Sequence, residues 1–174
     1  MDLETLKIDL KGLNVGHNPM VFKLDEAYFK AVDAPEVSRG NVEVRLDILR
    51  AEHDMFTLDF DICGTVIVPC DLCLDDMEQP VEAHERLTAK FGEDYSEEDN
   101  LVTVAEDEGI LDVTWYVYEC IALAIPIKHV HAPGKCNPAM IRVLDEHSAA
   151  RSGEGQQETV DPRWAALEQL KNKN

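Results

Sequence analysis

The sequence predicts an α+β domain: an antiparallel β-sheet or meander, partly barrel-like, with a Cys-x-x-Cys knuckle, one main helix and short C-terminal helices. Two long stretches alternate between apolar and charged residues, which is typical of strands with one buried and one wetted face. A later stretch carries apolar residues at helical spacing and ends at Pro126. The knuckle, which runs from Cys70 to Cys73, lies in the connection between two predicted strands.

The N-terminal part gives mixed signals. Apolar and charged residues alternate over Leu6–Leu10, which predicts a half-buried strand, and Val21–Leu24 is expected to form a short second strand. Between them, Gly12–Pro19 is rich in Gly and Asn and is expected to be a loop. The pattern does not decide between helix and strand for residues 25–32.

The central strands give the clearest signal. Asn41–Arg50 and Phe56–Val68 each place their apolar residues on one parity, and a short turn separates them, so an antiparallel hairpin is predicted. Residues 81–91 continue the pattern as a third strand. The acidic stretch Gly92–Gly109 is expected to be an open, solvated loop because its like charges repel one another.

The main helix is predicted over Asp112–Ile125, with Asp112 as its N-cap and Pro126 ending it. Glu119 lies beside the apolar stripe of this helix. It is either a structural carboxylate hydrogen-bonded to a nearby donor or a partner of a metal-binding histidine.

The C-terminal part is expected to hold shorter elements. A helix begins at Pro138 with Asn137 as its cap, and residues 1–148 are expected to form a single α+β domain. Residues 149–160 have the composition of a flexible linker. Residues 161–174 are predicted to form an amphipathic helix.

This terminal helix either docks on its own domain or binds a partner protein. The side chains expected to contact a partner are Arg163, Trp164 and Leu167. Arginine and tryptophan are enriched among the residues that carry most of the binding energy of interfaces.

Three cysteines and a histidine form a candidate structural zinc site. Zinc takes four ligands in a tetrahedron, and a two-residue gap lets one turn supply two thiolates, here Cys70 and Cys73. His131 and Cys136 would supply the other two ligands from a loop rich in Pro. His129 shares strand parity with His131 and is the alternative ligand. The alternative to a metal site is a set of reduced thiols and an exposed histidine.

Catalytic alternatives fit the sequence less well. A redox Cys-x-x-Cys needs the start of a helix, and the neighbouring Asp71, Asp75 and Asp76 are expected to raise the thiol pKa. A zinc enzyme needs an open coordination position, whereas four candidate ligands favour a closed site. The sequence also lacks a phosphate-binding Gly-rich loop, a nucleophile elbow and H-E-x-x-H. We therefore expect no catalytic residue and no small-molecule substrate.

The charge restricts the class of partner. The chain has 16 basic and 35 acidic residues, for a formal charge of −19. Its field repels RNA, DNA and anionic membranes and favours a basic protein partner, so direct RNA contact is expected to be weak or secondary. No apolar run reaches the roughly 20 residues of a membrane span, and the N-terminus lacks a signal core, so a cytoplasmic protein is expected.

Three stretches of the sequence, taken in order, resemble those of a known family. They are Gly64–Leu74 around the knuckle, Asp112–Cys136 through the main helix to the last cysteine, and Asp161–Leu167. In this combination the chain resembles the YceD family of large ribosomal RNA subunit accumulation proteins. The family pattern carries over onto Cys70, Cys73, Glu119, Pro126, Cys136 and the Asp161-Pro162-Trp164 segment.

The resemblance implies a non-catalytic accessory factor in biogenesis of the large ribosomal subunit. Such a factor would support accumulation of the large-subunit RNA and would contact the subunit precursor or a basic ribosomal protein. This chain has Asp71-Leu72 inside the knuckle, where a basic residue often precedes the second cysteine, which weakens a role for the knuckle in gripping RNA. A zinc- or thiol-dependent enzyme and a generic protein-interaction adaptor are the alternatives.

Overall fold

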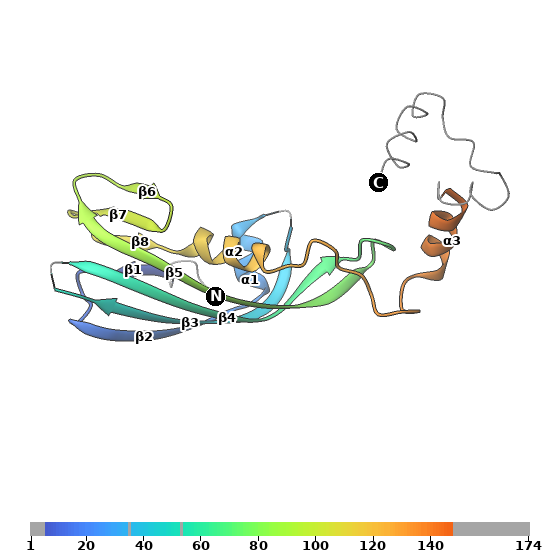
Figure 1. Ribbon diagram of the computed structural model, residues 1–174, viewed down its shortest axis with the longest axis horizontal. Helices are drawn as coiled ribbons and strands as arrows, with labels where there is room; N and C mark the ends of the chain where they lie inside the picture. The colour runs from blue at the N-terminus through green and yellow to red at the C-terminus, as the bar shows by residue number, and fades with distance from the viewer. Residues whose placement is uncertain (1–5, 35, 53, 148–174) are drawn as a thin grey trace, which may run out of the picture. The chain divides into compact units, whose positions relative to one another are not determined.

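The computed structural model describes residues 6–34, 36–52 and 54–147 of the chain. The chain divides into two units, residues 1–136 and residues 137–174, which are described separately. The first unit is a mixed α+β fold built on a six-stranded sheet and a two-stranded sheet (Figure 1). None of the helices in these described ranges is long and apolar enough to cross a membrane.

The six-stranded sheet is mostly antiparallel. Its strands, in spatial order, are β2 (Gly16–Leu24), β3 (Arg39–Arg50), β4 (Met55–Pro69), β5 (Asp76–Gly92), β7 (Leu101–Ala105) and β6 (Ser96–Glu98). The predicted hairpin is confirmed as β3 and β4, in which Leu46 lies opposite Phe60. β7 is parallel to β5 and pairs with it only over Thr88–Gly92. The sheet is open, with β2 and β6 at its edges, so the expected barrel-like closure is absent from the described strands.

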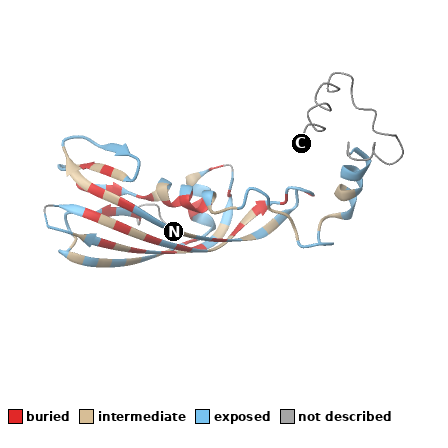
Figure 2. Ribbon diagram, viewed as in Figure 1, coloured by how far each residue is buried: buried red, intermediate tan, exposed pale blue. Residues whose placement is uncertain are grey.

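The core lies on one face of this sheet. Figure 2 shows buried residues alternating with more exposed ones along the central strands, as the apolar parity predicts. The fully buried side chains of β3 and β4 include Val44, Leu46, Ile48, Leu58, Phe60 and Ile62. Burying one such side chain stabilises the fold by about 1.5–3 kcal/mol, so these two strands supply much of the folding free energy.

Residues 25–32, for which the pattern did not decide between helix and strand, contain helix α1 (Glu26–Val32). The Asp25 carboxylate accepts hydrogen bonds from two backbone N–H groups in the first turn, at 3.1 and 3.3 Å, which favours a helix. Tyr28 and Phe29 of α1 are buried in the core. Gly40 of β3 makes room for this packing, because a Cβ atom there would lie 2.9 Å from the Phe29 ring.

Helix α2 (Thr114–Leu123) is the predicted main helix, shortened at both ends. Its N-cap is Val113, so the prediction of Asp112 as N-cap is wrong. Asp112 instead ends strand β8 (Ile110–Asp112), which pairs with β1 (Lys7–Asp9) in the two-stranded sheet. Its carboxylate still accepts a hydrogen bond, at 2.9 Å, from the first backbone N–H of the helix. The helix contacts β5 and α1.

Two loop predictions are wrong. The acidic stretch Gly92–Gly109 contains β6 and β7, because Val102 and Val104 alternate with more exposed residues and are buried in the core. The apolar alternation is short and is surrounded by acidic residues, so the sequence did not indicate these strands. Likewise, strand β2 begins at Gly16, inside the region expected to be a loop, and is therefore longer than predicted.

In the second unit, helix α3 (Pro138–His147) begins where it was predicted. The Asn137 side chain accepts a hydrogen bond from the backbone N–H of Ala139 at 3.0 Å, as a helix cap does. No residue of α3 is buried. The predicted linker, 149–160, and terminal helix, 161–174, lie outside the described residues.

Candidate metal centre

Cys70 and Cys73 lie in the turn that joins β4 to β5, and both are buried. The backbone N–H of Cys70 donates to the Asp75 carbonyl, and that of Leu74 donates to the Cys70 carbonyl, each at 2.9 Å. Leu74 has a φ of 62°, in the left-handed region, where the chain turns back toward β5. The backbone of the turn is therefore fixed by its own hydrogen bonds.

The segment 126–136 lies against this turn, although it contains no helix or strand. The backbone N–H of Asp71 donates to the His129 carbonyl at 3.0 Å, and the backbone N–H of His129 donates to the Asp71 carboxylate at 2.7 Å. The same carboxylate lies 3.6 Å from Nε2 of the His129 ring. Asp71 thus links the turn to a segment 58 residues later in the chain.

All four predicted ligands come together between the turn and this segment. One atom from each of Cys70, Cys73, His131 and Cys136 lies within 4.8 Å of the other three. Cys70 Sγ is 3.9 Å from Cys136 Sγ, and Cys73 Sγ is 3.3 Å from His131 Nδ1. A disulfide bond is about 2.05 Å long, so the two sulfurs are separate thiols.

These distances fit a tetrahedral metal ion. With metal–sulfur bonds of about 2.3 Å and metal–nitrogen bonds of about 2.0–2.1 Å, a tetrahedron separates two sulfurs by about 3.8 Å and a sulfur and a nitrogen by about 3.6 Å. The observed 3.9 and 3.3 Å are close to these values. Three sulfurs and one imidazole nitrogen are also the donor set of a common structural zinc site.

The electrostatics of the cluster suit a cation. Burial acts to raise the pKa of Cys70, but hydrogen bonds from backbone N–H groups, first that of Cys73 and then that of His131, outweigh it and lower the pKa to about 6. The expectation that acidic neighbours raise the thiol pKa is therefore wrong for Cys70. Burial raises the pKa of Cys136 to about 11, and the nearby Cys70 and Cys73 thiols add to this effect. A bound cation would relieve the repulsion between ionised sulfurs.

The other predicted site residues lie elsewhere. His129, the alternative ligand, is outside the cluster, and its Nδ1 lies 3.0 Å from the Pro126 carbonyl oxygen. Glu119 accepts a hydrogen bond from Trp115 Nε1 at 2.7 Å, on its own helix. The predicted partner-binding residues, Arg163, Trp164 and Leu167, lie outside the described part of the chain.

The remaining cysteines stand apart from the cluster. Cys63 is exposed on β4, and Cys120 is buried on α2, where burial raises its pKa to about 11. They are therefore natural controls for the cluster. The residue that the sequence reasoning missed is Asp71, since nothing in the sequence signals its bonds to His129.

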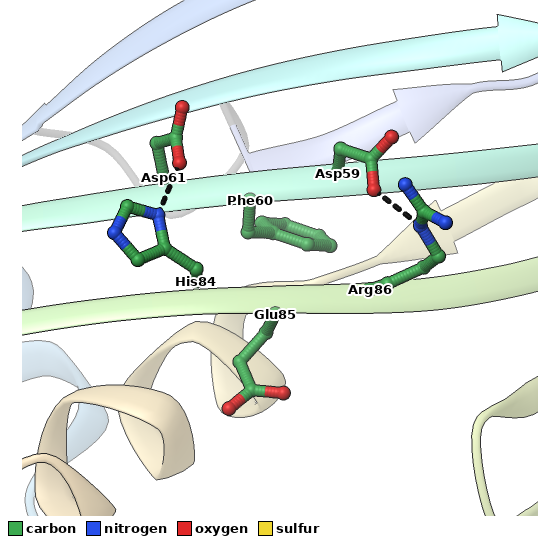
Figure 3. A pocket seen from close by; sticks show the side chains of 6 residues that line it. All are labelled: Asp59, Phe60, Asp61, His84, Glu85 and Arg86. Atoms are coloured by element: carbon green, nitrogen blue, oxygen red, sulfur yellow. Dashed lines mark hydrogen bonds and ion pairs between the residues drawn. The ribbon is translucent and has the colours of Figure 1, made fainter.

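A second candidate site is an open depression of about 420 Å³ on the charged face of the sheet. Figure 3 shows Asp61 of β4 paired with His84 of β5, and Asp59 paired with Arg86. Each pair is joined at 2.5 Å. Because Asp59 and Asp61 already have partners on the neighbouring strand, the cluster of Cys70, Cys73, His131 and Cys136 (the Cys/His cluster) is the stronger candidate.

The chain is similar to known proteins over most of its length. A family model described as "Large ribosomal RNA subunit accumulation protein YceD" matches residues 58–171, which include all four cluster residues. The chain is also 30% identical over 138 residues to "Uncharacterized protein YlbN" of Bacillus subtilis (strain 168), a match that covers 79% of this chain and 77% of that protein. No solved structure matches the chain. From these two matches, the chain belongs to the YceD family.

Proposed function

We propose that this protein is a zinc-containing, non-catalytic accessory factor that supports accumulation of large-subunit ribosomal RNA. The observation that carries the zinc part is the convergence of three sulfurs and one imidazole nitrogen within 4.8 Å. The ribosomal part is supported by the printed description of the family to which the chain belongs.

In this proposal zinc is held by Cys70, Cys73, Cys136 and His131, and the Cys70–Cys73 turn acts as a zinc knuckle. Four protein ligands leave no open position for a water or a substrate, so the ion would stabilise structure. It would join residues 58 and 66 positions apart in the chain and so order the segment 126–136. Zinc thiolates need reduced cysteines, which suits a cytoplasmic protein.

We further propose that the partner is a basic ribosomal protein or a large-subunit precursor that exposes one. The formal charge of −19 opposes direct binding to phosphates. The same charge would speed encounter with a basic protein, because opposite fields steer association. The predicted terminal helix, with Arg163, Trp164 and Leu167, is a proposed second contact with the partner.

The test is affinity capture of the tagged protein from its own cells at low salt, with and without nuclease. We expect large-subunit precursor RNA and ribosomal proteins, and we expect the proteins to remain after nuclease treatment. Capture of no ribosomal material would contradict the ribosomal role. Loss of all captured protein after nuclease would contradict a protein partner.

A matched pair of variants tests the zinc part. Cys136→Ser should lose stoichiometric zinc, measured by metal analysis of the purified protein, while Cys63→Ser should keep it. The lowered pKa of Cys70 would also suit thiol redox chemistry, which is the alternative. A metal-free wild-type protein that forms a reversible Cys70–Cys73 disulfide would favour that alternative.

A further inference from the structure

A second, smaller cavity of about 70 Å³ lies between helix α2, the end of β8 and the strands β5, β6 and β7. Its aromatic and acidic lining residues are Tyr95, Trp115, Tyr116, Glu97, Asp112 and Glu119. No lysine or arginine of the described ranges lines it. This combination of aromatic rings and carboxylates lies away from the Cys/His cluster, and the function proposed above does not use it.

Two of the aromatic rings are unusually accessible for their size. Trp115 is 54% exposed and Tyr95 is 59% exposed. Exposed large aromatic side chains that gather around a cavity mark a surface for binding. Trp115 also stacks at a tilt on Tyr118, with 5.3 Å between ring centroids, so the indole ring is held in place by its own helix.

Each exposed ring is tied to a carboxylate. Trp115 Nε1 donates to Glu119 at 2.7 Å, and the Tyr95 hydroxyl donates to Glu97 at 3.4 Å. A side chain that entered the cavity would therefore meet aromatic surface and negative charge together. Lys7 lies opposite Asp112 in the β1–β8 pair and offsets its charge. The negative charge of the cavity is therefore attributed to Glu97 and Glu119.

The chemistry selects one kind of ligand. Aromatic rings alone could stack on RNA bases, but the carboxylates here and the acidic segment 93–99, which includes β6, repel the phosphates that flank every base. An arginine side chain satisfies both features, because its planar guanidinium stacks on aromatic rings and donates paired hydrogen bonds to carboxylates. Lysine offers only a compact charge.

We propose that this cavity, the acidic–aromatic pocket, binds an arginine side chain presented by a basic protein segment. The assignment adds a contact site to the molecule, and it rests on the proposed function only in that both expect a basic partner. The chain's own fluorescence provides a direct readout, because it has two tryptophans and one of them, Trp115, lines the pocket.

The experiment uses the full chain carrying Trp164→Phe, in which Trp115 is the single tryptophan. The probe is an unstructured Gly-Ser peptide with three arginines, titrated at low salt beside matched peptides that carry lysine or uncharged citrulline. We expect a saturable change in Trp115 fluorescence with the arginine peptide, a weaker one with lysine and none with citrulline.

Paired variants separate the pocket from general attraction to an acidic protein. Tyr95→Ala should weaken binding of the arginine peptide about two- to fivefold, the range for one cation–π contact at an exposed site. Glu119→Gln, which removes one exposed ion pair, should weaken binding by a similar factor. Glu82→Gln removes one exposed carboxylate from the other part of β5 and should leave the affinity unchanged.

Two results would overturn the assignment: equal binding of the arginine and citrulline peptides, or equal weakening by Glu119→Gln and Glu82→Gln. Binding of an RNA oligonucleotide that changes Trp115 fluorescence would overturn the choice of a protein ligand. The ribosomal role is tested separately by capture. Arginine binding without captured ribosomal material would support the pocket and contradict the ribosomal role. Captured ribosomal material without arginine binding would support the ribosomal role and contradict the pocket.

Discussion

The body of the six-stranded sheet and the segment 126–136 are held in place by different interactions. In the sheet, every second residue of β3 and β4 is buried over long stretches. In the segment, no residue is buried, and there is no helix or strand. The sheet therefore derives its stability from apolar burial, whereas the segment is joined to the turn by the Asp71–His129 bonds and, in our proposal, by zinc bound to the Cys/His cluster. The comparison teaches that a bound metal would hold the segment 126–136 in an ordered conformation but would not determine the fold of the sheet.

The largest expected effect is a cavity in the sheet. Phe60 is 2% exposed and packs against Tyr116, with 5.2 Å between ring centroids. Phe60→Ala should lower the free energy of unfolding by about 3–5 kcal/mol, because it removes buried surface and leaves a void. Chemical denaturation measures this with zinc present and with a chelator. A loss that occurs only when zinc is bound would break the comparison, since the sheet would then depend on the metal.

An intermediate effect is expected at the link between the two regions. Asp71→Ala removes the carboxylate that accepts from the His129 backbone, so the segment loses a restraint that brings His131 and Cys136 to the turn. Zinc affinity, measured by competition with a chromophoric chelator, should fall about tenfold or more, as for other groups that orient metal ligands.

The matched control is Glu78→Gln, which removes an exposed carboxylate of β5 that lies outside the cluster. It should leave zinc affinity unchanged. If Asp71→Ala also leaves it unchanged, then the cluster orders the segment without help from Asp71, and the contrast between the two regions becomes sharper.

The smallest effect is a pH dependence on the charged face of the sheet. Hydrogen bonding to Asp61, together with its charge, raises the pKa of His84. Because the folded pKa is raised above the unfolded value, the stabilisation is fully present below the unfolded pKa and is lost as pH rises through the folded pKa. Both side chains are about two-thirds exposed, so the effect on stability is small. An NMR titration should show the pKa of His84 falling in Asp61→Asn, and an unchanged pKa would contradict the pairing.

The sequence predicted the sheet body because strand alternation is a local signal, visible without knowing which strands pair. It missed β7 because that strand has five residues and pairs in parallel with β5, a non-local arrangement hidden among carboxylates. The sequence did not decide between helix and strand for α1, because seven residues give no clear period. The hydrogen bonds that the Asp25 cap accepts favour the helix.

The four members of the cluster could be predicted because cysteine spacing is itself informative. Their support could not, because Asp71 acts through backbone groups of a residue 58 positions away. The acidic–aromatic pocket was missed for a related reason. Tyr95 and Glu97 line the cavity together with residues of α2 in a region that contains β6 and β7, and those strands were not expected.

The limited pairing of β5 with β7 has a consequence for self-association. From Asp76 to Leu87, β5 has a hydrogen-bonded strand on one side only among the described residues. Such an open edge invites a strand from another molecule, the first step toward aggregation. Pro80 lacks the N–H that a new strand would need, and Glu85 places a charge on the apolar parity of β5. This stretch of the chain therefore disfavours polymerisation through its own sheet.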